Sequence, residues 1–214
     1  MTQLQPPVPS PQPLILASSS PRRRELLAEA GYNFMVWPPA PDIECGVCSE
    51  SGPAGLVAEL ALRKAAAAVR SLQENTEAPG RNPIGSPGTM VLAADTVAEC
   101  DGFVLGKPQD EEHARAMLRQ LSGREHRVLT GVCLWRLGDS QPLVRVAATT
   151  LRMDPLSDAQ LDEYLASGQW EGKAGAFGYQ DRLGWVHIVE GSESNVVGLP
   201  METLAEMLDQ LQST

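Results

Sequence analysis

Apolar residues along the chain fall into short unbroken runs and into longer segments with helical spacing. The short runs are residues 14–18, 34–37 and 90–100, and the last is interrupted by Asp95 and Thr96. Apolar runs of this length favour strands that are buried on both faces. We therefore predict three strands, the first of which leads directly into a helix.

Helices and further strands follow in alternation. Residues 125–137 and 142–153 predict a β-hairpin across the turn "GDSQ", and residues 184–190 predict another strand. Because a hairpin is antiparallel while alternating strands and helices favour parallel pairing, we expect an α/β fold with a mixed sheet covered by helices. Helices are predicted from Pro21 to a stop at Gly31, and over residues 55–72, 110–123, 157–168 (with a Ser157…Gln160 capping box) and 199–212.

Composition narrows the class of protein. The 214 residues fit one domain, and 17 basic against 27 acidic side chains give a formal net charge of -10. That charge opposes binding to nucleic acids or anionic membranes, which need a broad basic face. No segment approaches the ~20 apolar residues of a membrane span. We expect a disordered Pro/Gln-rich tail at 1–13, one domain over 14–214 with a flexible insertion at 74–89, and a cytoplasmic location.

The cysteines offer a weak alternative function. Cys45 and Cys48 form a C-x-x-C pair, and Cys100 and Cys133 stand alone. A zinc site would need further ligands, and a thioredoxin-like redox pair would open a helix directly after a strand. Cys45 and Cys48 instead lie in a connection that contains Gly, Ser and Pro. Metal and redox roles are therefore the less favoured interpretations.

Three consecutive arginines occupy the first turn of the first predicted helix. Ser20 suits the N-cap and Pro21 the first helical position, so Arg22, Arg23 and Arg24 follow at once. A helix N-terminus carries about half a positive charge, and cations there are mildly destabilising. The arginines are either solvated or they face a strongly anionic ligand.

Other polar residues stand where chemistry is plausible. Asp95 interrupts an apolar strand, where an unpaired carboxylate is costly. It is either a satisfied structural residue or part of an active site, because such sites gather at strand ends of α/β folds. Lys64 in a predicted helix and Lys107 in "GKP" are open to the same two interpretations.

A glycine-punctuated stretch, "GKAGAFGYQD" over residues 172–181, matches neither a Walker A loop nor a dinucleotide-binding fingerprint. Its glycines would let main-chain N–H groups approach a ligand closely, and the Gln180 amide can read the edge of a nucleobase. A flexible connection is the alternative.

In combination these segments resemble one family, the Maf-like nucleoside triphosphate pyrophosphatases related to the septum formation inhibitor. The resemblance rests on "LILASSSPRRRELL", "AADTV", "GKP", "LSGREHRVLTGV", "GKAGAFGYQ" and "SNVVGLP", in that order from about residue 14 to the end. It implies a curved mixed sheet flanked by helices, with two lobes around a central cleft. It also implies hydrolysis of a nucleoside triphosphate between its α- and β-phosphates, giving a monophosphate and pyrophosphate.

The resemblance also implies roles for particular residues. Asp95 is expected to act as general base and as ligand of a divalent cation, Mg²⁺ or Mn²⁺. The family carries a carboxylate pair in the stretch written here "PDIEC", where the second acid would fall on Cys45. Glu44 is then the expected second metal ligand, with Asp42 as the alternative. The expected phosphate-binding residues are Ser18, Arg22, Arg23, Lys64 and Lys107.

Three positions divide the family by nucleobase preference. A branch similar to dTTP/UTP pyrophosphatases has Arg, Thr and Gln there, and a branch similar to 7-methyl-GTP pyrophosphatases has Trp, Gln and Glu. Arg22, Thr96 and Gln180 favour dTTP, UTP or a modified pyrimidine triphosphate as substrate. The 7-methyl-GTP branch and a non-catalytic nucleotide-binding regulator of cell division are the alternatives. The expected partner is the nucleoside triphosphate, and a homodimer is left open.

Overall fold

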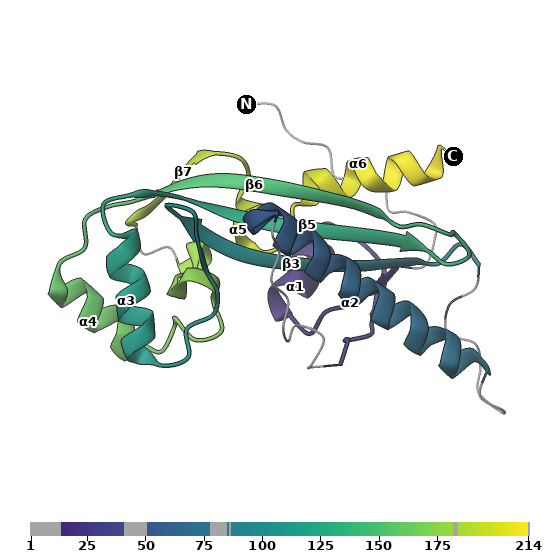
Figure 1. The fold of residues 1–214 in the computed structure, drawn as a ribbon, viewed down its shortest axis with the longest axis horizontal. Helices are drawn as coiled ribbons and strands as arrows, with labels where there is room; N and C mark the ends of the chain where they lie inside the picture. Colours follow the sequence, from purple (N-terminus) through teal and green to yellow (C-terminus); the bar gives the residue numbers. More distant parts are fainter. Residues whose placement is uncertain (1–13, 41–50, 78–84, 86, 182–183, 214) are drawn as a thin grey trace.

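A computed structural model describes residues 14–40, 51–77, 85, 87–181 and 184–213. Within these residues seven strands form one sheet in the order β2-β1-β3-β5-β6-β7, with β4 paired to β3 (Figure 1). β1 is parallel to β2 and β3, and the other pairs are antiparallel, so the prediction of a mixed sheet is confirmed. The strands are β1 (Leu14–Leu16), β2 (Phe34–Val36), β3 (Met90–Cys100), β4 (Phe103–Leu105), β5 (Glu125–Arg136), β6 (Leu143–Met153) and β7 (Val186–Glu190).

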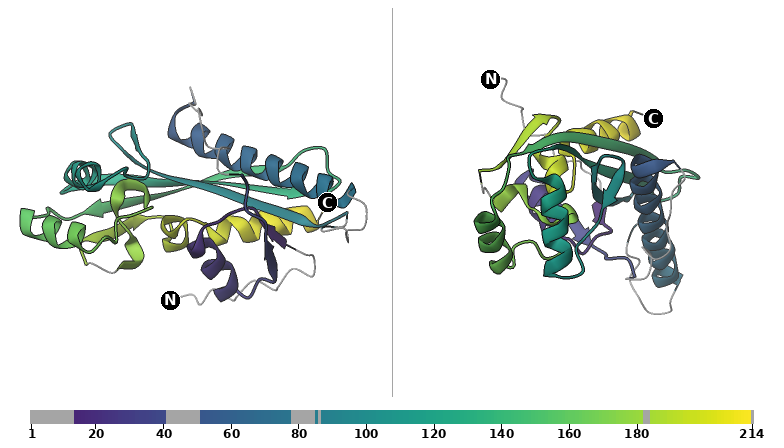
Figure 2. Two further views of the ribbon diagram at one scale, coloured as in Figure 1. Left: turned by 90° about the horizontal axis from the view of Figure 1, so that it is seen from below. Right: turned by 60° about the vertical axis from the view of Figure 1, so that its left-hand side comes forward.

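Helices cover both faces of the sheet. Side chains alternate along β3, so Val91 and Ala93 pack against α2 while Met90 and Leu92 pack against α1 and α6 on the opposite face. Figure 2 shows α2 on one side of the long strands and α1 and α6 on the other. The helices are α1 (Pro21–Glu29), α2 (Gly52–Glu77), α3 (Glu111–Leu121), α4 (Asp158–Ala166), α5 (Glu193–Val197) and α6 (Met201–Gln212), with single turns η2 (Ala174–Ala176) and η3 (Tyr179–Asp181).

The core is divided into two lobes that share the long strands. The lobe with α1, α2 and α6 is built on the first half of β3, where β1 also pairs. In the other lobe Ala98 and Cys100, near the end of β3, pack with α3 and α4 through residues such as Leu118 and Leu161. β3 and β5 therefore carry side chains of both lobes, as the expected two-lobed fold requires.

The structure differs from the sequence prediction at two helices. α2 ends at Glu77, five residues beyond the predicted end, because residues 73–77 contain neither Pro nor Gly. Residues 74–77 of the predicted flexible insertion are therefore helical. A short helix, α5, was not predicted from the sequence, and it begins where Ser192 accepts a hydrogen bond from Asn195 N–H at 3.3 Å. The tail 1–13 and residues 78–84 and 86 of the predicted insertion lie outside the described residues.

α2 approaches the sheet most closely at Gly131 of β5. A Cβ atom at this position would lie 2.1 Å from the main-chain oxygen of Val57 and 2.8 Å from the nitrogen of Ala58. Both neighbours are helix backbone, which cannot rotate away as a side chain would. Glycine at 131 therefore sets how closely α2 packs on β5.

We expect Gly131→Ala to lower the free energy of unfolding by about 3 kcal/mol or more, because α2 must shift outward to admit the methyl group. Urea unfolding of the purified protein measures this loss. Gly106→Ala is the control, because its Cβ would meet nothing within 4 Å, and it is expected to change stability by less than about 0.5 kcal/mol. Equal stability of the two variants would contradict the close approach.

His126 of β5 is buried in the second lobe, with its ring edge-on to Phe177 at a centroid distance of 5.2 Å. Burial lowers the pKa of His126 from 6.5 to about 4. The unfolded chain therefore binds a proton between these two pH values that the folded chain does not bind. Stability contributed by the neutral ring is fully present above about pH 6.5 and is lost as the pH falls.

We expect acidification from pH 7 to pH 5 to reduce the free energy of unfolding by about 2 kcal/mol through His126 alone. Carboxylates also titrate in acid, so the measurement is the difference in pH dependence between the wild type and His126→Leu in urea unfolding. The variant should lose less stability over this interval. Parallel pH profiles for the two proteins would rule out the buried neutral imidazole.

Candidate active site

A cavity of about 890 Å³ opens where one edge of β3 has no neighbouring strand among the described residues. β1 pairs with this edge only as far as Leu92, and β4 pairs with it only from Ala98 onward. The opposite edge is paired with β5 along nearly its whole length. The cavity therefore lies at the boundary between the two lobes, beside the segment of β3 that contains Asp95 and Thr96.

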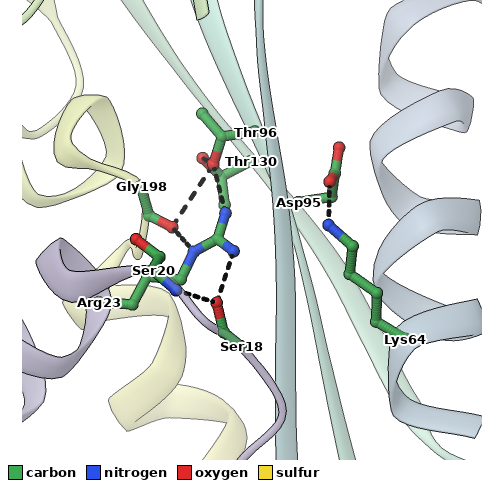
Figure 3. A network of polar contacts seen from close by, with 8 residues as sticks. All are labelled: Ser18, Ser20, Arg23, Lys64, Asp95, Thr96, Thr130 and Gly198. Atoms are coloured by element: carbon green, nitrogen blue, oxygen red, sulfur yellow. Dashed lines mark hydrogen bonds and ion pairs between the residues drawn. The ribbon is translucent and has the colours of Figure 1, made fainter. Parts of the chain in front are cut away.

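Asp95 and Thr96 point to opposite faces of the sheet because they are consecutive in a strand. Asp95 faces α2, and Thr96 faces α1 and α5, as Figure 3 shows on either side of β3. Both residues nevertheless line the cavity, since the unpaired edge leaves the two faces joined there. Groups from both layers of helices thus reach one space.

The Asp95 carboxylate is paired with the Lys64 ammonium of α2. Lys64 Nζ lies 2.5 Å from Asp95 Oδ1, and the two side chains are only 8% and 11% exposed. A buried carboxylate is tolerated when an opposite charge lies in contact. Asp95 Oδ2 makes no hydrogen bond to a described residue and is the oxygen left for a ligand.

Arg23 is fixed in place on the other face. Its Nε donates to Gly198 O at 2.8 Å, Nη1 to Ser18 Oγ at 3.2 Å and Nη2 to Thr96 Oγ1 at 3.1 Å (Figure 3). The residue is 8% exposed. Arg23 therefore connects the turn after β1, the middle of β3 and the segment after α5.

The Thr96 hydroxyl belongs to a chain of buried hydrogen bonds. Thr130 Oγ1 donates to Asn195 O at 3.2 Å and so accepts from Thr96 Oγ1, which lies 3.0 Å away. Gly198 O, 3.4 Å from Thr96 Oγ1, can only accept. Since a hydroxyl has one proton, Thr96 has none left for a ligand but retains acceptor capacity.

The N-terminus of α1 faces the cavity without a side-chain cap. Ser20 is the N-cap and Pro21 the first residue, as predicted, but the Ser20 side chain makes no cap hydrogen bond. The three arginines have different settings, because Arg22 is half-buried at the cavity, Arg23 is buried and Arg24 is exposed. Two arginines thus line the cavity beside an uncapped helix end.

The remaining predicted residues fall into three groups. Ser18 and Lys107 line the cavity, together with the wall formed by Gly172 and Gly178 of the glycine-rich loop. The backbone of Gln180 lies in η3, next to this wall, and its side chain is not described. The segment that contains Asp42, Glu44, Cys45 and Cys48 lies outside the described residues.

Sequence reasoning missed part of this site. Thr130, Asn195 and Gly198 support Thr96 and Arg23 through hydrogen bonds, and the sequence analysis assigned no role to any of the three. Asn195, 1% exposed, also donates to Val128 O and to Thr149 Oγ1. The one signal in the sequence is the Asn195 amide itself, a polar group in a segment that enters the core. Its hydrogen-bond partners could not be named from the sequence, because they lie 46 and 67 residues away in the chain.

Two further features bear on the class of protein. Among the described residues no group of three or more His, Cys, Asp or Glu is placed to hold a metal ion. None of the described helices combines the length and the apolar character needed to cross a membrane. The fold and site thus define an α/β protein with a cleft between two lobes, lined by cationic side chains and one buried carboxylate.

The chain belongs to the Maf-like protein family, which it matches over residues 13–211. It is 51% identical to a dTTP/UTP pyrophosphatase of Rhodopirellula baltica, over 95% of this chain and 84% of that protein. It is 46% identical to a dTTP/UTP pyrophosphatase of Symbiobacterium thermophilum, over 93% and 94% of the two chains. A structure of the Staphylococcus aureus Ham1 protein aligns at a TM-score of 0.41 and 14% identity, covering 66% of this chain and 72% of that one.

We expect Thr96→Val to lower the free energy of unfolding by about 1–3 kcal/mol, because Arg23 Nη2 loses an acceptor and Thr130 a donor. Urea unfolding checks this loss without reference to activity. Thr150→Val, at a half-buried position of β6, is the matched control and should be nearly neutral. A Thr96→Val protein as stable as the control would show that the hydrogen-bond chain does not stabilise the fold.

Proposed function

We propose that this protein is a nucleoside triphosphate pyrophosphatase that hydrolyses dTTP and UTP to the monophosphate and pyrophosphate. The relatives that bear this name share 36–51% of their residues with the chain over most of its length. The observation that carries the proposal is the cavity at β3, where the uncapped end of α1 and a buried Asp–Lys pair line the same space. The arrangement suits an anionic ligand beside a carboxylate.

The triphosphate would bind along the α1 side of the cavity. Main-chain N–H groups at a helix N-terminus and the helix dipole stabilise phosphate charge. We assign Arg22, Lys64 and Lys107 to direct charge contacts, together with the Ser18 hydroxyl. Arg23 donates three hydrogen bonds to the protein, so its guanidinium would add positive charge to this side of the cavity from a fixed position.

A divalent cation, Mg²⁺ or Mn²⁺, fits the chemistry of the carboxylate present. Asp95 Oδ2 is a hard oxygen donor at the cavity, and Mg²⁺ sites are commonly completed by substrate phosphates rather than by protein alone. We propose Asp95 and Glu44 as its protein ligands. When bound, such an ion neutralises phosphate charge and lowers the pKa of a coordinated water.

Asp95 is proposed as the general base. Its carboxylate would accept a proton from the water that attacks the α-phosphorus, and the contact with Lys64 would hold it in place. Lys64 would also stabilise charge that develops on the phosphate oxygens. The pair would thus place the general base, Asp95, beside a phosphate-binding cation, Lys64, at one point of β3.

Selection of the base is assigned to Thr96, Gln180 and Arg22. Thr96 can accept but not donate a hydrogen bond, which fits the N3–H donor that uracil and thymine carry and that cytosine lacks. The Gln180 amide would supply donor and acceptor groups to the same edge. Unpaired buried polar groups penalise the wrong base strongly.

The kind of binding partner and the cellular location are proposed from the composition of the chain. A formal net charge of -10 favours a small anionic substrate held by local cations over nucleic acid as partner. A cytoplasmic location remains part of the proposal, and a homodimer is left open.

The test is pyrophosphate release from a panel of canonical and modified triphosphates in Mg²⁺ or Mn²⁺. UTP and dTTP should lead the panel, and Asp95→Asn should reduce kcat by at least about 10²-fold because it removes the base. Asp101→Asn is the matched control, since Asp101 is exposed in the β3–β4 turn, and it should retain activity.

Two outcomes would overturn this proposal. A clear preference for 7-methyl-GTP would refute the assigned branch. Nucleotide binding without hydrolysis, unchanged between the wild type and Asp95→Asn, would instead indicate a regulator that binds nucleotides but does not hydrolyse them.

A further inference from the structure

A buried ion pair holds together the two ends of the glycine-rich loop. The proposed function assigns no role to either of its residues. Lys173 Nζ contacts Asp181 Oδ2, and the two side chains are 7% and 11% exposed. Tyr164 of α4 donates its hydroxyl proton to the same carboxylate oxygen at 3.1 Å. Lys173, Asp181 and Tyr164, called here the loop clamp, thus tie the start and end of the loop to α4.

The backbone of the loop passes directly over this pair. A Cβ atom at Gly178 would lie 2.6 Å from both Lys173 Nζ and Asp181 Oδ2. Gly178 also lines the cavity, so the clamp lies immediately behind the cavity wall. A side chain at this position would have to displace the Lys173 ammonium or the Asp181 carboxylate.

Little other regular structure fixes this wall. The loop contains only the single turns η2 and η3, although Gly175 N–H donates to Gly106 O at 3.0 Å and Phe177 packs on His126. The clamp acts at the end that bears Gln180, which directly precedes Asp181 in η3. Asp181 therefore restrains the backbone of the residue assigned to base selection.

Electrostatics also connect the clamp to the cavity. Burial lowers the pKa of Lys173, the positive charge of Arg22 lowers it further, and Asp181 opposes both effects. Arg22 lines the cavity from α1, so its charge acts at the space in which the triphosphate would bind. Anionic phosphate placed there would oppose the effect of Arg22 on Lys173.

Burial of an ion pair is a poor way to gain stability, because desolvation offsets most of the attraction. Such a pair does fix geometry, since each charge loses its partner if the loop shifts. We propose that Lys173, Asp181 and Tyr164 are positioning residues that hold Gln180 and the Gly178 wall in the arrangement that selects pyrimidine triphosphates. This inference rests on the proposed function.

The test replaces the whole clamp by apolar residues of similar size, in the triple variant Lys173→Met, Asp181→Leu and Tyr164→Phe. No charge is then left buried alone, so we expect the melting temperature to stay within about 5 °C of wild type. The ratio of kcat/KM for UTP to kcat/KM for ATP should fall by about tenfold, chiefly through KM for UTP. An unchanged ratio in the folded variant would overturn the proposal.

A milder variant covers the case in which the triple variant does not fold. Tyr164→Phe keeps the ion pair and removes only the hydroxyl, and it should lower the same ratio by about threefold. The matched control is Arg119→Gln with Asp158→Asn, which removes an exposed ion pair joining α3 to α4 in the same lobe. Identical ratios in Tyr164→Phe and in the control would count against the clamp.

Hydrogen exchange separates failure of the clamp from failure of the proposed function. In the absence of nucleotide, backbone amides of residues 172–181 should exchange at least about tenfold faster in Tyr164→Phe than in wild type, while those of α3 keep their protection. Unchanged exchange in the loop would overturn the clamp whatever the enzyme hydrolyses. Faster exchange in a protein without triphosphatase activity would overturn only the proposed function.

Discussion

The partial pairing of one edge of β3 is the constraint on which the site depends. A strand paired on both edges along its full length would bury its main chain and separate the helices on its two faces. Here β1 pairs with β3 only as far as Leu92, and β4 begins to pair at Ala98, so Asp95 and Thr96 reach a common cavity from opposite faces. The β5 ladder on the other edge keeps this segment extended, and Gly131 lets α2 bring Lys64 close enough to pair with Asp95.

The charges of the cleft differ from those of the molecule as a whole. The chain carries a net charge of -10, yet among the described residues the cavity is lined by four cationic side chains and three carboxylates. The cations are held individually: Lys64 by Asp95, and Arg23 by Ser18, Thr96 and Gly198. Local fields of this kind favour a compact anion, whereas the overall charge disfavours an extended polyanion such as nucleic acid.

Local patterns in the sequence were sufficient for most of the fold. The run at 90–100 became β3 with the same bounds, and the capping box at Ser157 opens α4 as expected. The residues that meet at the cavity could be grouped only through the family resemblance, because no local pattern says that a helix at 64 faces a strand at 95. The supporting residues were missed for the same reason: Thr130 and Asn195 act through partners 34 to 67 residues away. Hydrogen bonds over such separations follow from sheet register, and a single sequence does not reveal that register before the strands are paired.

In the proposed function, the two buried polar networks at the cavity would divide the task of recognising the base. The chain from Asn195 through Thr130 and Thr96 to Arg23 fixes donors and acceptors in direction, since both hydroxyl protons are taken by acceptors within the protein. The loop clamp instead fixes position, because an ion pair constrains distance more than direction. A ligand between them would meet a rigid polar surface on the β3 side. On the loop side it would meet a wall whose position is fixed mainly by the loop clamp beneath it. Rigid polar groups discriminate by leaving the wrong ligand unpaired, so strict base selection requires both sides to be held.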